Sequence, residues 1–263
     1  MKEFDLDVIN RVARKQKLSL GNAEKDYVLS AALGVLSELG LDFVFKGGTC
    51  LKKAYYPEFR FSSDLDFALK KTEEKEEKER KEDVARKIRK AFENKAIHGI
   101  RFLKTKTVER EKKGNAALAL QYESRVSEAA HVDSIRTEFS AELPVLREAN
   151  ERAILNPVEY ALTETRIACM ALEEILAEKI HAVYHRRKPR DLYDLAFLLE
   201  KGISVDRELI SAKLKPLNAE LTAESFGERA KILGESWSED LSKIFVEIPD
   251  FESARAFVLK KLF

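Results

Sequence analysis

Two aspartates stand two residues apart in the segment DLDFAL, at Asp64 and Asp66 of a chain of 263 residues. They alternate with Leu65 and Phe67, which is the pattern of a half-buried strand. On a strand, residues i and i+2 face the same side, so both carboxylates lie on one face, about 6.6 Å apart along the chain. They can converge on one or two divalent ions, and oxygen ligands favour Mg²⁺ or Mn²⁺. By itself the pair also fits a solvated strand face.

A double glycine precedes this acid pair. Gly47 and Gly48 follow an apolar run at 43–46 and precede a helix expected over 50–56, with Thr49 as its N-cap. Glycine permits a positive φ and close approach of a ligand, and N–H groups at a helix start favour an anion. The sequence allows either a plain turn with surface cations or a phosphate-binding turn beside a metal-binding pair. The nearby cations are Lys46, Lys52, Lys53 and Arg60.

The elements that must position these residues form a mixed sheet with flanking helices. Helices are expected within 1–20, 22–40 and 70–92, and strands at 43–46, 64–69, 100–109, 116–123 and 135–139. A turn at 113–115 predicts an antiparallel hairpin. The region 144–155 is expected to be a partly helical connection.

From residue 171 the apolar residues recur at helical spacing almost to the end of the chain. Helices are expected at 171–185, 191–200, 207–214, 222–233, 239–245 and 251–262. The predicted fold class is therefore α+β. We expect a sheet domain over 1–155 and a mainly helical domain over 156–263.

A lysine lies inside the apolar stripe of the first of these helices. Lys179 follows Ile175 and Leu176 at helical spacing. A lysine on a buried face needs a charged partner, unless its ammonium reaches the edge of the stripe. Asp191 and Asp194 share one face of the next helix, and Asp191 also suits the first turn as a capping acid. The intervening sequence HRRKPR is basic and suits a triphosphate or an RNA backbone.

These two regions together resemble a known family. The order of strand, Gly-Gly-Thr, helix and R-x-S-x-D-x-D resembles the polymerase-β type of nucleotidyltransferase. The chain is similar to the AbiEii-type toxins of type IV toxin–antitoxin systems in two segments, FKGGTCLKKAY…RFSSDLDF and LEEILAEKIHAVYHRRKPRDLYDLAFLLEKG. The likeness covers roughly residues 25–200, and the last sixty residues match no motif. We expect those to form a helical cap that shapes the acceptor site.

The resemblance implies a set of site residues. Asp64 and Asp66 would bind the metal, Lys179 would bind phosphate, and Asp194 would act as base or orient the acceptor. A third acid is expected from the strand at 135–139. Glu138 is the candidate, and Asp133 is the alternative. The residues expected to bind the nucleotide are Gly47, Gly48, Thr49, Lys53, Arg60, Ser62 and Asp191. We also predict that Lys179 and Asp194 lie within a nucleotide's length of the acid pair.

The function implied by the resemblance is transfer of a nucleotide from an NTP to an acceptor hydroxyl, with Mg²⁺ or Mn²⁺. The family suggests tRNA 3′ ends as acceptor and an AbiEi-type antitoxin as partner. Two other interpretations keep the same residues. One is a kinase-like phosphotransferase that acts on a protein or on the chain itself. The other is a non-catalytic protein that binds nucleotide or an antitoxin.

Composition excludes several other classes. The net charge is +1, so a polyanionic partner would need a local basic patch. The two cysteines, Cys50 and Cys169, are too few for a zinc site or a disulfide framework. His181 and His185 are four residues apart on a helix, but no third metal ligand is placed by the sequence. No apolar run approaches 18 residues and the first residues do not read as a secretory signal, so we expect a soluble cytoplasmic protein.

Overall fold

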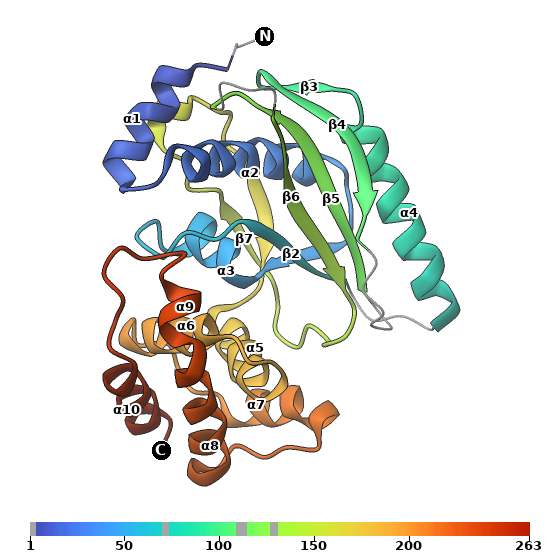
Figure 1. Cartoon of the computed structure of the whole chain (residues 1–263). Helices are drawn as coiled ribbons and strands as arrows, with labels where there is room; N and C mark the ends of the chain where they lie inside the picture. The colour runs from blue at the N-terminus through green and yellow to red at the C-terminus, as the bar shows by residue number, and fades with distance from the viewer. Residues whose placement is uncertain (1–3, 70–73, 109–114, 127–130) are drawn as a thin grey trace. The chain divides into compact units, whose positions relative to one another are not determined.

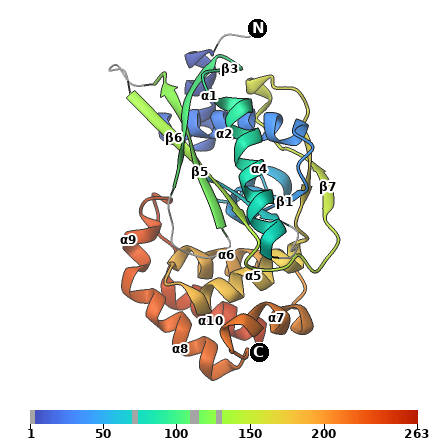
Figure 2. The same cartoon turned by 90° about the vertical axis from the view of Figure 1, so that its right-hand side faces the viewer.

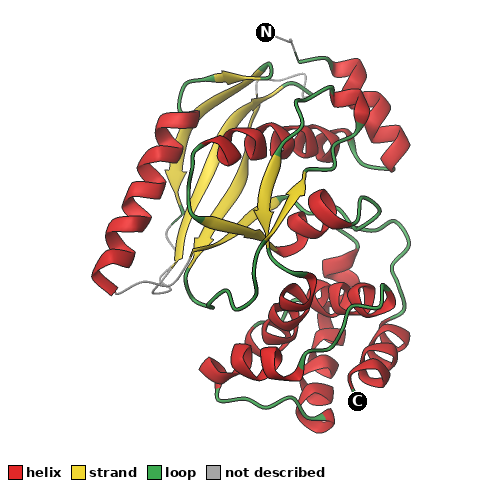
Figure 3. Cartoon of the chain, turned by 180° about the vertical axis from the view of Figure 1, so that it is seen from behind, coloured by secondary structure: helices red, strands yellow, loops and turns green. Residues whose placement is uncertain are grey.

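The computed structural model describes residues 4–69, 74–108, 115–126 and 131–263, and the chain forms two compact units (Figure 1). Unit 1 comprises residues 1–145 and 149–169, and unit 2 comprises 146–148 and 170–263. The division falls later than the expected boundary at 155, because the strand Arg166–Cys169 pairs within the sheet of unit 1. In the described part of the chain, every strand belongs to unit 1 (Figure 3).

Unit 1 is built on one mixed sheet, which confirms the predicted class. Its strand order is β3-β4-β5-β6-β2-β1-β8-β7. Strand β2 is antiparallel to β1 and parallel to β6, and β1 is parallel to β8. The strands are β1 (Phe43–Lys46), β2 (Asp64–Leu69), β3 (Ala96–Ile97), β4 (Ile100–Thr107), β5 (Asn115–Ser124), β6 (His131–Ser140), β7 (Asn150–Ala153) and β8 (Arg166–Cys169).

The predicted hairpin is present as the antiparallel pair β4 and β5. Most of its turn, residues 109–114, lies outside the described residues. Strand β7 differs from the expectation of a partly helical connection at 144–155. Its sequence NERA has no apolar alternation, and it is a strand because it pairs antiparallel with β8 at the sheet edge.

One face of the central strands carries an aromatic core. Phe67 lies 4.4 Å from Phe43 and 5.2 Å from Phe139, measured between ring centroids, and all three side chains are buried. Because these rings occupy one side of β1, β2 and β6, the alternate residues of β2 must face the other side. That opposite face is where Asp64 and Asp66 lie.

The helices of unit 1 begin at recognisable caps. Asp5 accepts a hydrogen bond from the Asp7 amide at the start of α1, and Ser19 accepts one from the Asn22 amide at the start of α2. Helix α2 is mostly buried and runs across the sheet, whereas α4 packs against β4 and β5 (Figure 1). The helical elements are α1 (Leu6–Gln16), α2 (Leu20–Glu38), α3 (Gly47–Cys50), the π-helical turn η1 (Leu51–Tyr55), α4 (Glu74–Phe92) and the 3₁₀ turn η2 (Val158–Tyr160).

Unit 2 is helical, as predicted, and Figure 2 shows its helices gathered around one another. Helix α6 begins with Pro189, whose fixed φ suits the first helical position. Asp206 and Asp250 cap α7 and α10. The elements are α5 (Leu172–His185), α6 (Pro189–Glu200), α7 (Arg207–Leu214), η3 (Lys215–Leu217), α8 (Ala223–Leu233), η4 (Gly234–Ser236), α9 (Trp237–Leu241) and α10 (Phe251–Leu262).

A buried ion pair explains why residues 146–148 belong to unit 2. The carboxylate of Glu174 on α5 accepts hydrogen bonds from the amides of Leu146 and Arg147, at 2.8 and 2.9 Å. It also lies 2.6 Å from the ammonium of Lys213 on α7, and both side chains are fully buried. The pair therefore holds three segments together. Within the described ranges, no helix has the length and apolar character needed to cross a membrane.

Candidate functional site

The acid pair lies on a polar face in the middle of the sheet of unit 1. Asp64 and Asp66 are half-buried, whereas Leu65 and Phe67 between and after them are fully buried. In the parallel pairing of β2 with β6, Asp66 stands opposite Glu138. Residues paired in this way point to the same side of a sheet. The carboxylate of Glu138, which is distant in sequence, is thus brought to the same face as those of Asp64 and Asp66.

Backbone geometry explains the first glycine of the turn. Gly47 directly follows β1 and has a φ of +78°, where other residues are strained. A Cβ atom at this position would lie 2.6 Å from Oδ2 of Asp66. A side chain is therefore excluded both by the backbone conformation and by the carboxylate. The glycine turn and the acid pair lie side by side.

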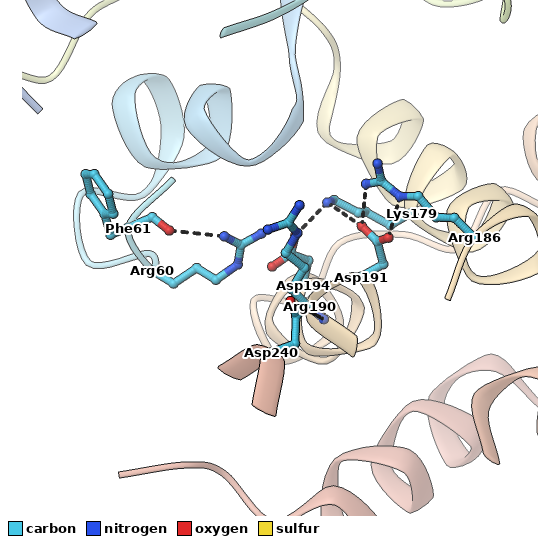
Figure 4. A network of polar contacts seen from close by, with 8 residues as sticks. All are labelled: Arg60, Phe61, Lys179, Arg186, Arg190, Asp191, Asp194 and Asp240. Carbon is cyan, nitrogen blue, oxygen red and sulfur yellow. Dashed lines mark hydrogen bonds and ion pairs between the residues drawn. The ribbon is translucent and has the colours of Figure 1, made fainter. Parts of the chain in front are cut away.

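The second glycine makes room for two other residues of the predicted set. A Cβ atom on Gly48 would lie 2.9 Å from the Ser62 hydroxyl and 3.2 Å from the Arg60 guanidinium. Arg60 is largely buried, lies over the ring of Phe59 at 5.2 Å and donates a 3.1 Å hydrogen bond to the Phe61 carbonyl (Figure 4). Arg60 and Ser62 therefore pack directly against the turn.

Thr49 has a different role from the predicted N-cap. The helix begins at Gly47, with Lys46 as its capping residue, so Thr49 lies within the first turn. Its buried hydroxyl donates a 2.5 Å hydrogen bond to the carbonyl of Asp64. This bond fixes the start of α3 to the start of β2. The first backbone N–H groups of α3 have no acceptor within the helix itself.

Lys53 is placed in the core instead of on the phosphate-binding side. Its ammonium lies 2.6 Å from Asp26 and 2.8 Å from the Ser30 hydroxyl, and the residue is only 2% exposed. The Tyr160 hydroxyl donates to the same Asp26 carboxylate at 3.0 Å. Lys53 therefore connects η1 with α2 and η2. We leave it out of the nucleotide-binding set, because a cation buried in this network cannot reach a phosphate.

The two candidates for the third acid, Asp133 and Glu138, both lie on β6 but have different partners. The carboxylate of Asp133 accepts a 3.2 Å hydrogen bond from the Tyr122 hydroxyl and forms a 3.0 Å ion pair with Lys25. Burial alone would raise the pKa of Asp133, but the Ser134 amide and Lys25 hold it below its usual value. Glu138, by contrast, stands opposite Asp66 and forms an ion pair with Arg136.

Asp64, Asp66 and Glu138 form an oxygen-only donor set, and such a set suits Mg²⁺ or Mn²⁺. Gly47 adds a surface without a side chain directly beside Asp66. These residues fit a divalent ion in chemical type. In the described residues, no three His, Cys, Asp or Glu side chains are already arranged around a metal position.

In unit 2, the buried lysine has its charged partners. The ammonium of Lys179 on α5 lies 2.6 Å from Asp194 and 2.9 Å from Asp191, both on α6 (Figure 4). Lys179 is 7% exposed and both aspartates are fully buried. Of the two alternatives that the sequence left open for Lys179, the structure has the charged partner.

Asp191 has a second cationic partner that the sequence placed only in a basic run. Arg186 contacts both carboxylate oxygens of Asp191, at 2.8 and 3.0 Å. Burial alone would raise the pKa of Asp191, but the charges of Lys179 and Arg186 hold it well below its usual value. Asp191 is thus fixed as a carboxylate. The i,i+5 spacing of Arg186 and Asp191 across a helix start was the available signal.

Each unit can contribute different chemistry. The polar face of β2 in unit 1 can bind a divalent cation, and the adjoining glycine turn presents backbone N–H groups. The network of Lys179, Asp191 and Asp194 in unit 2 offers a cation whose position is fixed by two carboxylates. A fixed cation of this kind can stabilise charge on a phosphate.

Comparison with known proteins supports the same class. The family model described as nucleotidyl transferase AbiEii toxin of type IV toxin–antitoxin systems matches residues 29–258. JHP933 from Helicobacter pylori is 21% identical, with a TM-score of 0.59 over 93% of this chain and 91% of that one. MenT4, a nucleotidyltransferase toxin from Mycobacterium tuberculosis H37Rv, is 18% identical, with a TM-score of 0.66 over 98% and 88%. No curated protein sequence matches. The predicted family resemblance is confirmed.

Proposed function

The chain belongs to the AbiEii family of nucleotidyl transferase toxins, and we propose that it transfers a nucleotide from an NTP to an acceptor hydroxyl with the help of Mg²⁺. The observation that carries this proposal is the register of β2 and β6, which sets Glu138 opposite Asp66. Gly47 lies beside the same carboxylate, since a Cβ atom added to it would be 2.6 Å from Oδ2 of Asp66. An acid set beside a glycine turn suits a metal-bound triphosphate, since the metal and the phosphates must lie together.

In the proposed reaction, the acceptor oxygen forms a bond to the α-phosphorus of the NTP, and the bond from that phosphorus to the leaving pyrophosphate breaks. Asp64 and Asp66 would hold the metal, and Glu138 would complete the acid set. When bound, the ion neutralises phosphate charge and lowers the pKa of the attacking hydroxyl. The N–H groups at the start of α3 bind phosphate oxygens, with Arg60 and Ser62 supporting the turn that presents them.

In unit 2, Lys179 binds phosphate and Asp194 orients the acceptor or accepts its proton. Asp191 positions Lys179, because its carboxylate contacts both the ammonium and Arg186. A type IV toxin belongs to a toxin–antitoxin system, so a cognate antitoxin is the expected partner. A tRNA 3′ end is the acceptor that we propose to test first.

The test uses the full chain, Mg²⁺, total RNA and each NTP labelled on either its α- or its γ-phosphate. Incorporation of the α label into RNA supports nucleotidyl transfer. Transfer of the γ label alone, to a protein or to the chain itself, would instead identify a phosphotransferase. NTP binding in calorimetry without transfer of either label would identify a non-catalytic binding protein.

Two variants sharpen the result. We expect Asp66→Asn to lower α-label incorporation at least about a hundredfold, because it removes a charge from the metal-binding set. Asp83→Asn is the matched control, since the ion pairs of this acid on α4 with described residues are to its helix neighbours Arg86 and Lys87. Equal activity of wild type and Asp66→Asn would contradict the assigned site.

A further inference from the structure

An arginine stands within the acidic face of unit 1. Arg136 lies opposite Asp64 in the pairing of β2 with β6, two residues before Glu138 on the same strand. Its guanidinium forms an ion pair with the Glu138 carboxylate, and the two side chains are 25% and 24% exposed. The acid best placed to complete the metal site is therefore already bound to a cation of the protein.

The contacts of Arg136 are incomplete. Its Nε atom is buried and has no hydrogen-bond partner among the described residues. A buried donor without an acceptor is unfavourable. The guanidinium can therefore donate a hydrogen bond that Glu138 does not accept. Its neighbours Ile135 and Thr137 are fully buried on the other side of the strand. Arg136 is thus confined to the acidic face, where it can change partner without entering the core.

We infer that Arg136 is an exchangeable counter-ion of the metal site, a role that rests on the proposed function. In the metal-free protein it neutralises Glu138. A divalent ion bound by the acid set competes for Glu138, and the guanidinium then pairs with the triphosphate that arrives with the metal. A planar guanidinium suits both partners, because carboxylate and phosphate accept the same paired hydrogen bonds.

The partial exposure of the pair makes this exchange feasible. Ion pairs in contact with water contribute little net stability, so losing one costs little when another forms. A permanent structural pair would behave differently, because its loss would disturb the strand and weaken metal and nucleotide binding together. If Arg136 is an exchangeable counter-ion, its removal should instead strengthen metal binding and weaken nucleotide binding.

The experiment compares Arg136→Gln with wild type by two measurements on the full chain. The first is Mn²⁺ binding without nucleotide, followed by electron paramagnetic resonance of the free ion. We expect Arg136→Gln to bind Mn²⁺ about two- to fivefold more tightly, because Glu138 no longer has a competing cation. The second is calorimetric binding of α,β-methylene-ATP at saturating Mn²⁺. Here we expect the variant to bind about tenfold more weakly.

Two further variants serve as controls. Arg136→Lys retains the charge and should recover part of the nucleotide affinity. Arg101→Gln removes an arginine that pairs with Glu123 across β4 and β5, and it should change neither measurement. Circular dichroism and thermal melting check that each variant is folded.

The possible failures are distinguishable. Mn²⁺ affinity that is unchanged or weaker in Arg136→Gln, or unchanged nucleotide affinity, overturns the counter-ion role. Wild-type chain that shows no Mn²⁺ binding dependent on Asp66 contradicts the proposed function itself. If Asp66→Asn abolishes Mn²⁺ binding and Arg136→Gln leaves it unaltered, only the role of Arg136 is contradicted.

Discussion

In the described part of the chain, three buried lysines each lie 2.6 Å from a carboxylate: Lys53 from Asp26, Lys179 from Asp194 and Lys213 from Glu174. A buried lysine needs such a partner, because removing an unpaired charge from water costs on the order of several kcal/mol. Only the Lys179 pair belongs to the proposed catalytic residues. The other two join segments of one unit, so a buried ion pair by itself does not identify a functional residue.

Substitution of Lys179 should affect stability as well as activity. In Lys179→Met, the carboxylates of Asp191 and Asp194 remain buried while losing a shared cation. We expect the free energy of unfolding to fall by about 3–5 kcal/mol. Trp237 is the only tryptophan in the sequence and is buried in unit 2, so its fluorescence during guanidinium titration reports on this unit. Lys231→Met on the exposed surface of α8 is the control, and equal midpoints for both variants would contradict the prediction.

Gly47→Ala separates backbone strain from collision with the acid pair. The new Cβ would meet Asp66 at 2.6 Å and would also impose a strained positive φ. We expect a loss of about 1–3 kcal/mol in stability together with loss of label transfer, because the carboxylate must shift. Gly40→Ala is the matched control, since Gly40 also has a positive φ but no atom of the described residues lies within 4 Å of the added Cβ. Retained transfer activity in Gly47→Ala would count against the assigned geometry.

Residue patterns predicted the local arrangement and missed contacts between distant segments. The alternation in β2 placed Asp64 and Asp66 on one face. The stripe of α5 left two alternatives for Lys179, a charged partner or an ammonium at the edge of the stripe. The partner of Lys53 could not be inferred in the same way. Asp26 is 27 residues earlier and Tyr160 more than a hundred residues later, and only the tertiary packing brings them together.

At the level of elements, helix α5 connects most of unit 2. It packs against α6, α7 and α8, and it carries Glu174 as well as Lys179. Glu174 binds Lys213 on α7, and Lys179 binds two aspartates on α6. The two ion pairs lie on successive parts of one helix, so they fix the position of α5 against both neighbours.

The depressed pKa of Asp191 makes the stability of unit 2 dependent on pH. A carboxyl group with a lower pKa when folded takes up a proton on unfolding, so its contribution is present at neutral pH and is lost as pH falls below about 3.9. We expect Asp191→Asn to be less stable than wild type at pH 7, with the difference narrowing toward pH 3. Urea titrations followed by Trp237 fluorescence measure this difference.

Other acids with lowered pKa, such as Asp206 and Asp250, are present in both proteins and cancel in this comparison. A constant difference in stability between pH 7 and pH 3 would exclude Asp191 as the titrating group.

Helices and strands with a strong hydrophobic periodicity could be predicted from the sequence. A strand that forms only because it pairs with its neighbours in the sheet could not. The helices of unit 2 and strands β1, β2 and β4 were predicted close to their observed bounds. Strand β8 was not predicted, because its few residues form a strand only through pairing with β1 and β7. The same pairing moved the unit boundary from 155 to 169.

At the scale of the whole molecule, the placement of Lys53 bears on where the phosphate-binding cations come from. Because the ammonium of Lys53 is paired with Asp26 in the core, Lys53 does not add a cation to the polar face around Gly47. Lys52 is also a poor candidate for binding phosphate, since its ammonium donates a hydrogen bond to the Pro57 carbonyl and burial lowers its pKa. A triphosphate needs cationic ligands in addition to the metal. Lys179 of unit 2 therefore becomes more important to the proposed reaction.

The resemblance in sequence predicts that Lys179 and Asp194 lie within a nucleotide's length of Asp64 and Asp66, and this stays a prediction. It can be tested with Fe²⁺ in place of Mg²⁺, because iron bound at the acid pair generates hydroxyl radicals that cut nearby backbone when ascorbate and peroxide are added. With ATP present, we expect cuts near 62–68 in unit 1 and also within 179–194 in unit 2. Asp66→Asn should lose both sets together. Asp66-dependent cuts confined to unit 1 would show that the helical unit does not complete the site.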